Sequence, residues 1–299
     1  MDLVFRTPRM PVLGETISGQ EFREIPGGKG ANQAVAAARQ GGAVAFVGCV
    51  GDDGFGQRSL SSLQADGIAT SAIRQVANCA TGVAGIFVDD SGGNSIVLAS
   101  GANAELSVAD IDAARDQITS SKLLICQLEV PLSVVRHAIA IAHAQQVAVV
   151  LNPAPAQALE NALLAQVSYL IVNETEAEQL SGIAVLDQAS ASLAAQDLLQ
   201  RGVATVLITM GAQGVLVCDA KDGARFFSGL KVQAVDTTAA GDTFVGAFSV
   251  AVANGLSVDQ AAIDAQYAAA LTVTQLGAQS SIPQLAQVLQ FKQSLTAGK

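Results

Sequence analysis

Short runs of β-branched and aliphatic residues alternate with Ala- and Leu-rich stretches along most of this chain. The runs lie at 43–50, 123–128, 147–151, 169–172 and 205–209. Each run is long enough for a buried strand, and most of the stretches between them are long enough for crossover helices. The alternation therefore predicts an α/β fold with a central, mostly parallel sheet flanked by helices in three layers.

A second, smaller sheet is expected in the first third of the chain. Residues 82–88 and 95–98 are predicted to form two strands around a glycine-containing turn. The segment 15–25 alternates in a similar way, so we expect it to join this hairpin outside the main sheet. The predicted organisation is a single domain over residues 1–299, with lid segments at about 10–25 and 81–100.

The composition limits the classes of protein and of partner. With 299 residues, 50% of them hydrophobic and 14% charged, the chain can bury a large core. The formal net charge of −10 argues against a nucleic-acid partner, which requires clustered Lys and Arg. An anionic ligand would have to be bound locally, by Lys29, by backbone amides or by a divalent ion.

The cysteines and the apolar runs indicate the compartment. Cys49, Cys79, Cys126 and Cys218 are widely spaced and form no metal-binding pattern, as expected of reduced thiols. The N-terminus lacks the apolar core of a signal peptide, and no run of eighteen apolar residues occurs in the chain. We therefore expect a cytoplasmic protein with no membrane partner.

The segment 235–244 combines small residues, a glycine and one carboxylate where a helix over 239–254 is expected to begin. The amides of Ala240, Gly241 and Asp242 would lie in its first turn, and the N-terminus of a helix attracts phosphate. Asp242 at this position would suit a base that takes a proton from a hydroxyl attacking a phosphoryl group. The alternative is that Asp242 is only a first-turn acid that stabilises the helix.

A glycine-rich segment at 27–32 precedes an Ala-rich helix expected over 33–40. Its glycines would let the backbone approach a ligand, while Lys29 and Asn32 offer hydrogen bonds. The segment lacks the Walker A pattern, because its Lys is followed by Gly. A ligand-binding loop and a tight turn into the helix both remain open.

Acidic side chains follow two of the expected strands. Glu129 follows the strand at 123–128, at the carboxyl end where open α/β sheets bind ligands, although a solvated loop acid is equally compatible. Asn173 and Glu176 follow the strand at 169–172, and their spacing predicts a helix N-cap with its reciprocal partner. The same two side chains could hold Mg²⁺ through water, and both interpretations can hold together.

A further glycine-rich segment, 209–214, connects two apolar runs. It is compatible with a hairpin turn between two strands. It is equally compatible with a glycine-rich edge that admits a flat adenine ring, and spacing does not distinguish the two.

Taken together, these motifs resemble the ribokinase-like carbohydrate kinase family. The resemblance rests on segments 27–32, 152–156, 173–176 and 236–244, in this order and at these separations, and it extends from about residue 2 to about residue 290. It implies a central sheet flanked by helices and a small β lid that also forms a homodimer contact. The implied activity is ATP-dependent phosphorylation of D-ribose at its 5-hydroxyl.

The resemblance also implies roles for individual residues. Asp242 corresponds to the catalytic base, and the amides of Ala239, Ala240, Gly241 and Asp242 to an anion hole. The implied sugar ligands are Asp2, Gly28, Lys29, Asn32, Glu129 and Asp242. The implied nucleotide ligands are Asn173, Thr209, Met210, Gly211, Ala212, Gln213, Gly214, Gly241 and Gln266, with Glu176 tied to Mg²⁺. The implied K⁺ site, a monovalent cation activator, comprises Asp236, Thr238, Thr272, Gln275, Gly277 and Ser281.

The chain departs from the family pattern in two places. Family members begin with an apolar strand and a turn just before the position of Asp2, and this chain has neither. Burial of about four or five strand residues would contribute roughly 1.5–3 kcal/mol each. Their sum is comparable with a domain's whole net stability of about 5–15 kcal/mol. We hypothesise that Met1 is an internal methionine of a longer natural product, or that another segment fills the gap. Gln266 replaces a His or Asn of the nucleotide pocket and can still donate and accept hydrogen bonds.

Three functions remain open at the level of the sequence. The first is ribose phosphorylation, and the second is phosphorylation of another pentose, deoxyribose or a nucleoside. The third is non-catalytic binding of a sugar or nucleotide, caused by the missing strand. The intact Asp242 and the small residues of the expected anion hole count against the third.

Overall fold

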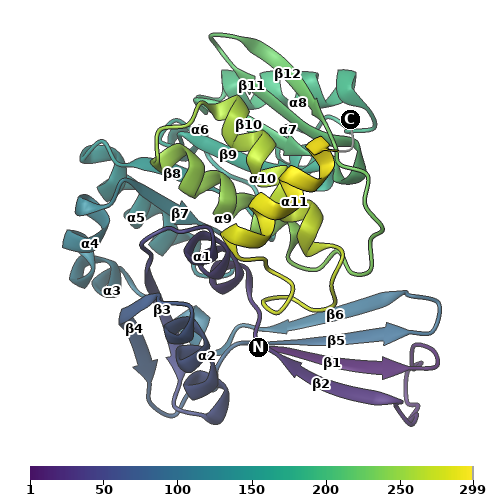
Figure 1. Ribbon diagram of the computed structural model, residues 1–299. Coiled ribbons are helices and arrows are strands. Elements are labelled where there is room, and N and C mark those ends of the chain that lie inside the picture. Colours follow the sequence, from purple (N-terminus) through teal and green to yellow (C-terminus); the bar gives the residue numbers. More distant parts are fainter. Residues whose placement is uncertain (298–299) are drawn as a thin grey trace.

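The main sheet has six strands in the order β12-β11-β10-β9-β8-β7, sandwiched between helices in the computed structural model, which describes residues 1–297 (Figure 1). The strands are β7 (Leu123–Cys126), β8 (Ala148–Leu151), β9 (Tyr169–Asn173), β10 (Thr205–Thr209), β11 (Gly214–Asp219) and β12 (Gly223–Ser228). Strands β7 to β10 run parallel, whereas β10, β11 and β12 are joined antiparallel. The predicted three-layer, mostly parallel sheet is confirmed.

Both faces of this sheet are buried, which explains why its strands are continuously apolar. In β8, Val149 and Leu151 belong to one core cluster and Val150 belongs to the other. The first cluster packs against α5 (Leu132–Ala144), α7 (Glu174–Ser181) and α8 (Gln188–Gln200). The second packs against α9 (Ala240–Ala253), α10 (Val258–Thr272) and α11 (Leu285–Ala297). Short helices α3 (Val108–Ala113), α4 (Arg115–Ser120) and α6 (Asn161–Leu164) connect these elements.

The small sheet has the order β2-β1-β5-β6, formed by β1 (Asp2–Thr7), β2 (Glu21–Ile25), β5 (Val83–Asp89) and β6 (Asn94–Ala99). The β5–β6 hairpin agrees with the sequence expectation. The strand expected at 15–25 is confined to its last five residues, and residues 15–20, which include Gly19, form no ladder. It pairs with β1, which the sequence reading did not anticipate.

Strands β3 (Ala45–Gly51) and β4 (Ala69–Val76) form a two-stranded parallel sheet that is separate from the main sheet. Helix α2 (Gly54–Ala65) connects the two strands. Within residues 1–297, no strand lies between β3 and β7. The hypothesis that another segment fills the place of the first family strand is therefore wrong for the described chain. The nearest candidate in sequence, β1, is engaged in the small sheet.

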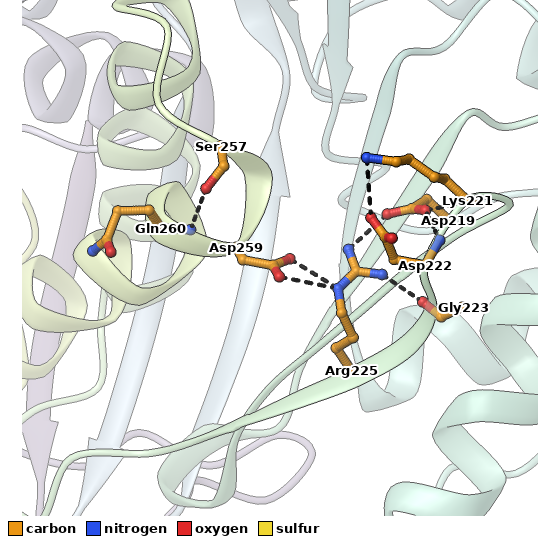
Figure 2. A network of polar contacts seen from close by, with 8 residues as sticks. All are labelled: Asp219, Lys221, Asp222, Gly223, Arg225, Ser257, Asp259 and Gln260. Carbon is orange, nitrogen blue, oxygen red and sulfur yellow. Dashed lines mark hydrogen bonds and ion pairs between the residues drawn. The ribbon is translucent and has the colours of Figure 1, made fainter.

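The antiparallel edge of the main sheet is attached to α10 by one arginine (Figure 2). The Arg225 guanidinium lies 2.6 Å from an Asp219 oxygen on β11 and 2.9 Å from an Asp259 oxygen in the first turn of α10. This side chain is only 20% exposed, so solvent screens these contacts less than it screens a surface ion pair. None of the helices described is both long and apolar enough to cross a membrane.

Candidate active site

Helix α1 (Lys29–Arg39) begins four residues earlier than the sequence indicated. Gly28 is its N-cap and has φ 92, a backbone conformation that favours glycine. The glycine-rich segment is therefore the tight entry turn and the first turn of the helix, so the turn interpretation is confirmed and the expected helix start at residue 33 is wrong. This start places Lys29 at the tip of α1 and Asn32 and Gln33 one turn further along.

Asp242 lies in the first turn of α9, is 8% exposed, and is fixed by donors from α1. The side-chain amide of Asn32 donates to one carboxylate oxygen at 2.9 Å, and that of Gln33 donates to the other at 3.0 Å. Burial raises the pKa of Asp242, while Lys29 and the two amides act in the opposite direction. A buried carboxylate held by two donors and flanked by a lysine has the properties of a positioned general base.

Gln33 is a site residue that the sequence reading missed. It is 1% exposed, and its amide also donates to the side-chain oxygen of Asn152 at 3.0 Å. Asn152 follows β8 and donates to the carbonyl of Ile171. The only signal in the sequence was a glutamine within an otherwise Ala- and Val-rich stretch. Gln33 thus connects Asp242 to the central strands of the sheet.

Two acceptors of this network have no hydrogen-bond partner among the described residues. They are the side-chain oxygens of Asn32 and Gln33, both buried. The great majority of buried polar atoms in proteins are paired, so these two acceptors beside the base are open to a donor, either a water or a hydroxyl of a ligand. A polyhydroxylated molecule supplies such donors.

Buried carboxylates surround the tip of α1. The backbone amide of Lys29 donates to Glu129 at 2.8 Å, and the Asp2 carboxylate lies against Gly27, where a Cβ would come within 2.1 Å of it. Burial raises the pKa of Asp2 and of Glu129, and the Lys29 ammonium opposes this rise in both. The structure therefore brings Asp2, Gly28, Lys29, Asn32, Glu129 and Asp242 together, with the Met1 ammonium as a second cation beside Asp2 and Glu129.

The Asn173–Glu176 element forms the predicted capping box of α7. The Asn173 side chain accepts from the Glu176 amide at 2.8 Å, and the Glu176 carboxylate accepts from the Asn173 amide at 2.9 Å. Burial raises the pKa of Glu176, while the Asn173 amide and Lys29 lower it. The capping interpretation is confirmed, and it leaves Glu176 within the electrostatic reach of Lys29 and Asp242.

The segment 209–214 is a hairpin between antiparallel strands β10 and β11, through a 3₁₀ turn η2 (Gly211–Gln213). Of the two structural interpretations, the hairpin turn is confirmed. Thr209 is paired in register with Asn173, so this turn lies beside the start of α7. The turn, Asn173, Asn152 and Glu129 all follow strand ends, and they share the carboxyl edge of the sheet, where open α/β folds bind ligands. Gln266 lies half-buried on α10.

Two loops near the start of α9 are tied together by Asp236. Its carboxylate accepts from Thr238 at 2.9 Å and from the Gly277 amide at 2.9 Å. Burial opposes ionisation of Asp236, yet these hydrogen bonds prevail and lower its pKa. The carbonyl of Thr272 accepts from the Gln275 amide at 3.1 Å, and the Ser281 hydroxyl donates to Ala278 at 2.8 Å. An ionised Asp236 among carbonyl groups is compatible with a monovalent cation.

Within residues 1–297 no cluster of three or more His, Cys, Asp or Glu side chains has the geometry of a metal cage. A divalent ion at this site would therefore take most of its ligands from water and from substrate phosphates, as Mg²⁺ does. The site combines a buried base, a helix N-terminus and the carboxyl edge of a three-layer sheet. These features are expected of an α/β kinase that acts on a hydroxylated small molecule.

Comparison with known proteins agrees with this class. The pfkB family carbohydrate kinase model matches residues 1–285. A ribokinase of Haemophilus influenzae is 48% identical over 97% of this chain and 94% of its own. The structure of an Arabidopsis thaliana ribokinase complexed with ribose and ATP is 31% identical and covers 97% of this chain and 95% of its own, with a TM-score of 0.89. A deoxyribokinase of Salmonella typhi is 38% identical over 97% of this chain and 95% of its own.

The chain belongs to the pfkB family of carbohydrate kinases, as the motifs at residues 27–32 and 236–244 had indicated. The structural similarity to solved ribokinases extends over nearly the whole chain, including both the three-layer sheet and the small sheet.

Proposed function

We propose that this protein phosphorylates D-ribose at its 5-hydroxyl with ATP, giving ribose 5-phosphate and ADP. The observation that carries the proposal is the buried Asp242 carboxylate, fixed by Asn32 and Gln33 at the N-terminus of α9. The similarity to ribokinases over nearly the whole chain supports the choice of sugar.

In the proposed reaction Asp242 takes the proton of the 5-hydroxyl. The resulting oxygen forms a bond to the γ-phosphorus of ATP while the bond from that phosphorus to the β-γ bridging oxygen breaks, and ADP leaves. The amides of Gly241 and Asp242 have no backbone acceptor in residues 1–297 and are placed to donate to the phosphoryl oxygens. The Ala240 amide already donates to the Thr237 carbonyl at 3.3 Å, so it contributes less to the anion hole.

The sugar is held by the groups around the tip of α1. Asp2, Lys29 and Glu129 offer charged partners for hydroxyls, and the unpaired oxygen of Asn32 accepts from one of them. A Cβ on Gly28 would be in ordinary contact with a Glu129 oxygen 3.7 Å away, so the positive φ, rather than a clash, is what favours glycine beside this carboxylate. A molecule with several hydroxyls satisfies this set better than an apolar one.

The nucleotide is assigned to the carboxyl edge of β9 and β10. Asn173 and the residues Thr209, Met210, Gly211, Ala212, Gln213 and Gly214 would contact ATP, together with Gln266 and the Gly241 amide. Glu176 would bind Mg²⁺ through a water molecule and with one oxygen only, because its other oxygen accepts from the Asn173 amide. When bound with ATP, Mg²⁺ neutralises charge on the phosphates.

We further propose K⁺ activation through the loops of Asp236 and Gly277. The candidate ligands are Asp236, Thr238, Thr272, Gln275, Gly277 and Ser281. A cation there would order the loop that leads into Ala239 and the anion hole. Ala239 has φ 60, so this entry into α9 already adopts a conformation that is costly for a residue with a side chain.

The test is ADP release measured with a panel of sugars, with and without Mg²⁺ and K⁺. We expect turnover with D-ribose that requires Mg²⁺ and rises with K⁺. Higher turnover with deoxyribose than with D-ribose would make deoxyribose the assigned substrate. The similarity to a deoxyribokinase favours this alternative. Ribose or ATP binding in calorimetry without any product would contradict the kinase assignment and favour a binding protein.

A further inference from the structure

Helix α1 ends in an arginine that holds a segment far along the chain. In the last turn of α1, Nη1 of Arg39 donates to the carbonyl oxygens of Gln279 at 2.6 Å and Ile282 at 2.8 Å. Its Nε and Nη2 donate to the two carboxylate oxygens of Asp66, the C-cap of α2, at 2.7 and 3.0 Å. The Arg39 side chain is only 19% exposed, so the bidentate pair is weakly screened and fixes the orientation of the guanidinium.

Two neighbouring side chains hold the same segment. The amide of Gln40, directly after α1, donates to the Pro283 carbonyl at 2.9 Å. The Ser62 hydroxyl of α2 donates to the side-chain oxygen of Gln279 at 3.2 Å. Five of the six residues at 278–283 are buried. Side chains of α1 and α2, rather than solvent, therefore set the path of this segment.

Residues 277–282 form a loop, the cation loop, that begins beside Asp236. The Gly277 amide donates to the Asp236 carboxylate at 2.9 Å, and Ser281 lies between the two residues whose carbonyls Arg39 holds. A guanidinium stays charged and has donors but no acceptor, so it holds carbonyl oxygens at any working pH. The two candidate K⁺ ligands of this loop are thus fixed from both ends, by Asp236 and by Arg39.

We infer that Arg39 is a positioning residue for the candidate K⁺ site, because it fixes the cation loop in the conformation that presents Gly277 and Ser281 together. Arg39 acts through the loop and not as a ligand of the cation. Since the first turn of α1 carries the candidate sugar ligands, the arginine also attaches the cation loop to the helix that holds the sugar. The inference rests on the proposed K⁺ activation and adds a residue outside its ligand set.

The direct test compares Arg39→Gln with wild type in K⁺ titrations at constant ionic strength, with tetramethylammonium as the balancing cation. The first readout is Tm without sugar or nucleotide, which reports K⁺ binding to the folded protein. The second readout is ADP release with D-ribose, ATP and Mg²⁺. For Arg39→Gln we expect the half-saturating K⁺ concentration to rise about tenfold in both readouts, whereas turnover at saturating K⁺ stays close to that of wild type.

Arg201→Gln is the matched control. Arg201, the C-cap of α8, also holds two backbone carbonyls, those of Leu180 at 2.5 Å and Leu159 at 2.7 Å, but neither belongs to the cation loop. This variant should lower Tm at every K⁺ concentration and leave the half-saturating concentration unchanged. Arg39→Lys keeps the charge but not the planar fork, so we expect a smaller rise in the same direction. If Arg39→Gln does not fold, Arg39→Lys carries the test.

The outcomes separate this inference from the proposed function. If wild type responds to K⁺ and the Arg39 variants only lose Tm, with an unchanged half-saturating concentration, the inference is overturned and the kinase assignment stands. If wild type turns over D-ribose but neither its Tm nor its turnover depends on K⁺, the K⁺ site and the inference both fail. A shifted Tm titration in Arg39→Gln, without turnover of any sugar by wild type, would support the inference and contradict the kinase assignment.

Discussion

At the residue scale, Asp242 has two separable consequences. Asp242→Asn should lower kcat by about 10²–10⁴-fold because the base is lost, while ribose affinity changes little. The new Asn side chain can keep its oxygen toward the Asn32 amide, so the Asn32 oxygen stays open to the sugar. ADP release and ribose calorimetry measure the two effects, with exposed Asp116→Asn as the control. Near-normal turnover of Asp242→Asn would exclude it as the base.

The same substitution has a predicted effect on stability that depends on pH. Burial raises the pKa of Asp242, so the folded state keeps its proton at pH values where the unfolded chain, with a carboxyl pKa near about 4, has lost it. The contribution of Asp242 to the free energy of unfolding of the wild type therefore falls as the pH rises from about 4 to the pKa of Asp242 in the folded state. Denaturant melts should show Asp242→Asn gaining stability over wild type across that interval. A difference that is constant with pH would contradict the burial argument.

Gln33 is predicted to position the base. Gln33→Met keeps the volume and removes both the donor to the Asp242 carboxylate and an acceptor open to the sugar. We expect kcat to fall about tenfold with a smaller rise in the KM for ribose. The acid limb of the rate profile should move to higher pH, because the charged form loses a hydrogen bond. A purely structural role would lower Tm without moving the acid limb.

At the element scale, the crossing of α1 and α9 fixes the distance between the sugar ligands and the base. A Cβ on Gly246 would lie 2.5 Å from the Ala36 Cβ and 2.7 Å from the Gln33 carbonyl. Gly246→Ala should therefore destabilise the fold by about 1–3 kcal/mol. Gly241→Ala, in the same helix with nothing within 4 Å, is the matched control for thermal melts. Equal Tm values for the two variants would show that the helices can separate at no cost.

The elements differ in how far the sequence predicts them. The apolar runs of β8, β9 and β10 were placed within a residue or two, because strands buried on both faces are continuously apolar. Strand β1 was missed, since it lies on a small sheet and its alternation is interrupted by the exposed Arg6. The start of α1 was missed because a glycine-rich segment usually indicates a loop, whereas here only Gly28 requires the left-handed conformation within that turn.

At the scale of the whole molecule, the predictable part of the site is the part set by topology. Asn173 and Thr209 end parallel strands of the main sheet and Glu129 follows another, so the fold alone brings them to one edge. The pairing of Gln33 with Asn152, which is 119 positions away, depends on side-chain directions across two elements. No local pattern encodes that contact. The position of a site is therefore easier to predict from sequence than the network that fixes its base.

The assembly of the molecule is predicted to depend on the edge of the small sheet. All six residues of β6 are exposed, and Ile96, Val97 and Leu98 are each more than half exposed. An exposed apolar edge strand is a template for pairing with another chain, so we expect a homodimer through this sheet.

Val97→Lys places a charge at the centre of that edge and should convert the dimer to a monomer in sedimentation velocity, because the ammonium would be buried without a partner. Leu186→Lys, at a side chain 82% exposed outside the sheets, is the matched control and should remain dimeric. If Val97→Lys sediments as wild type does, the contact lies elsewhere. A monomeric wild type at micromolar concentration would mean that β6 stays unpaired in solution.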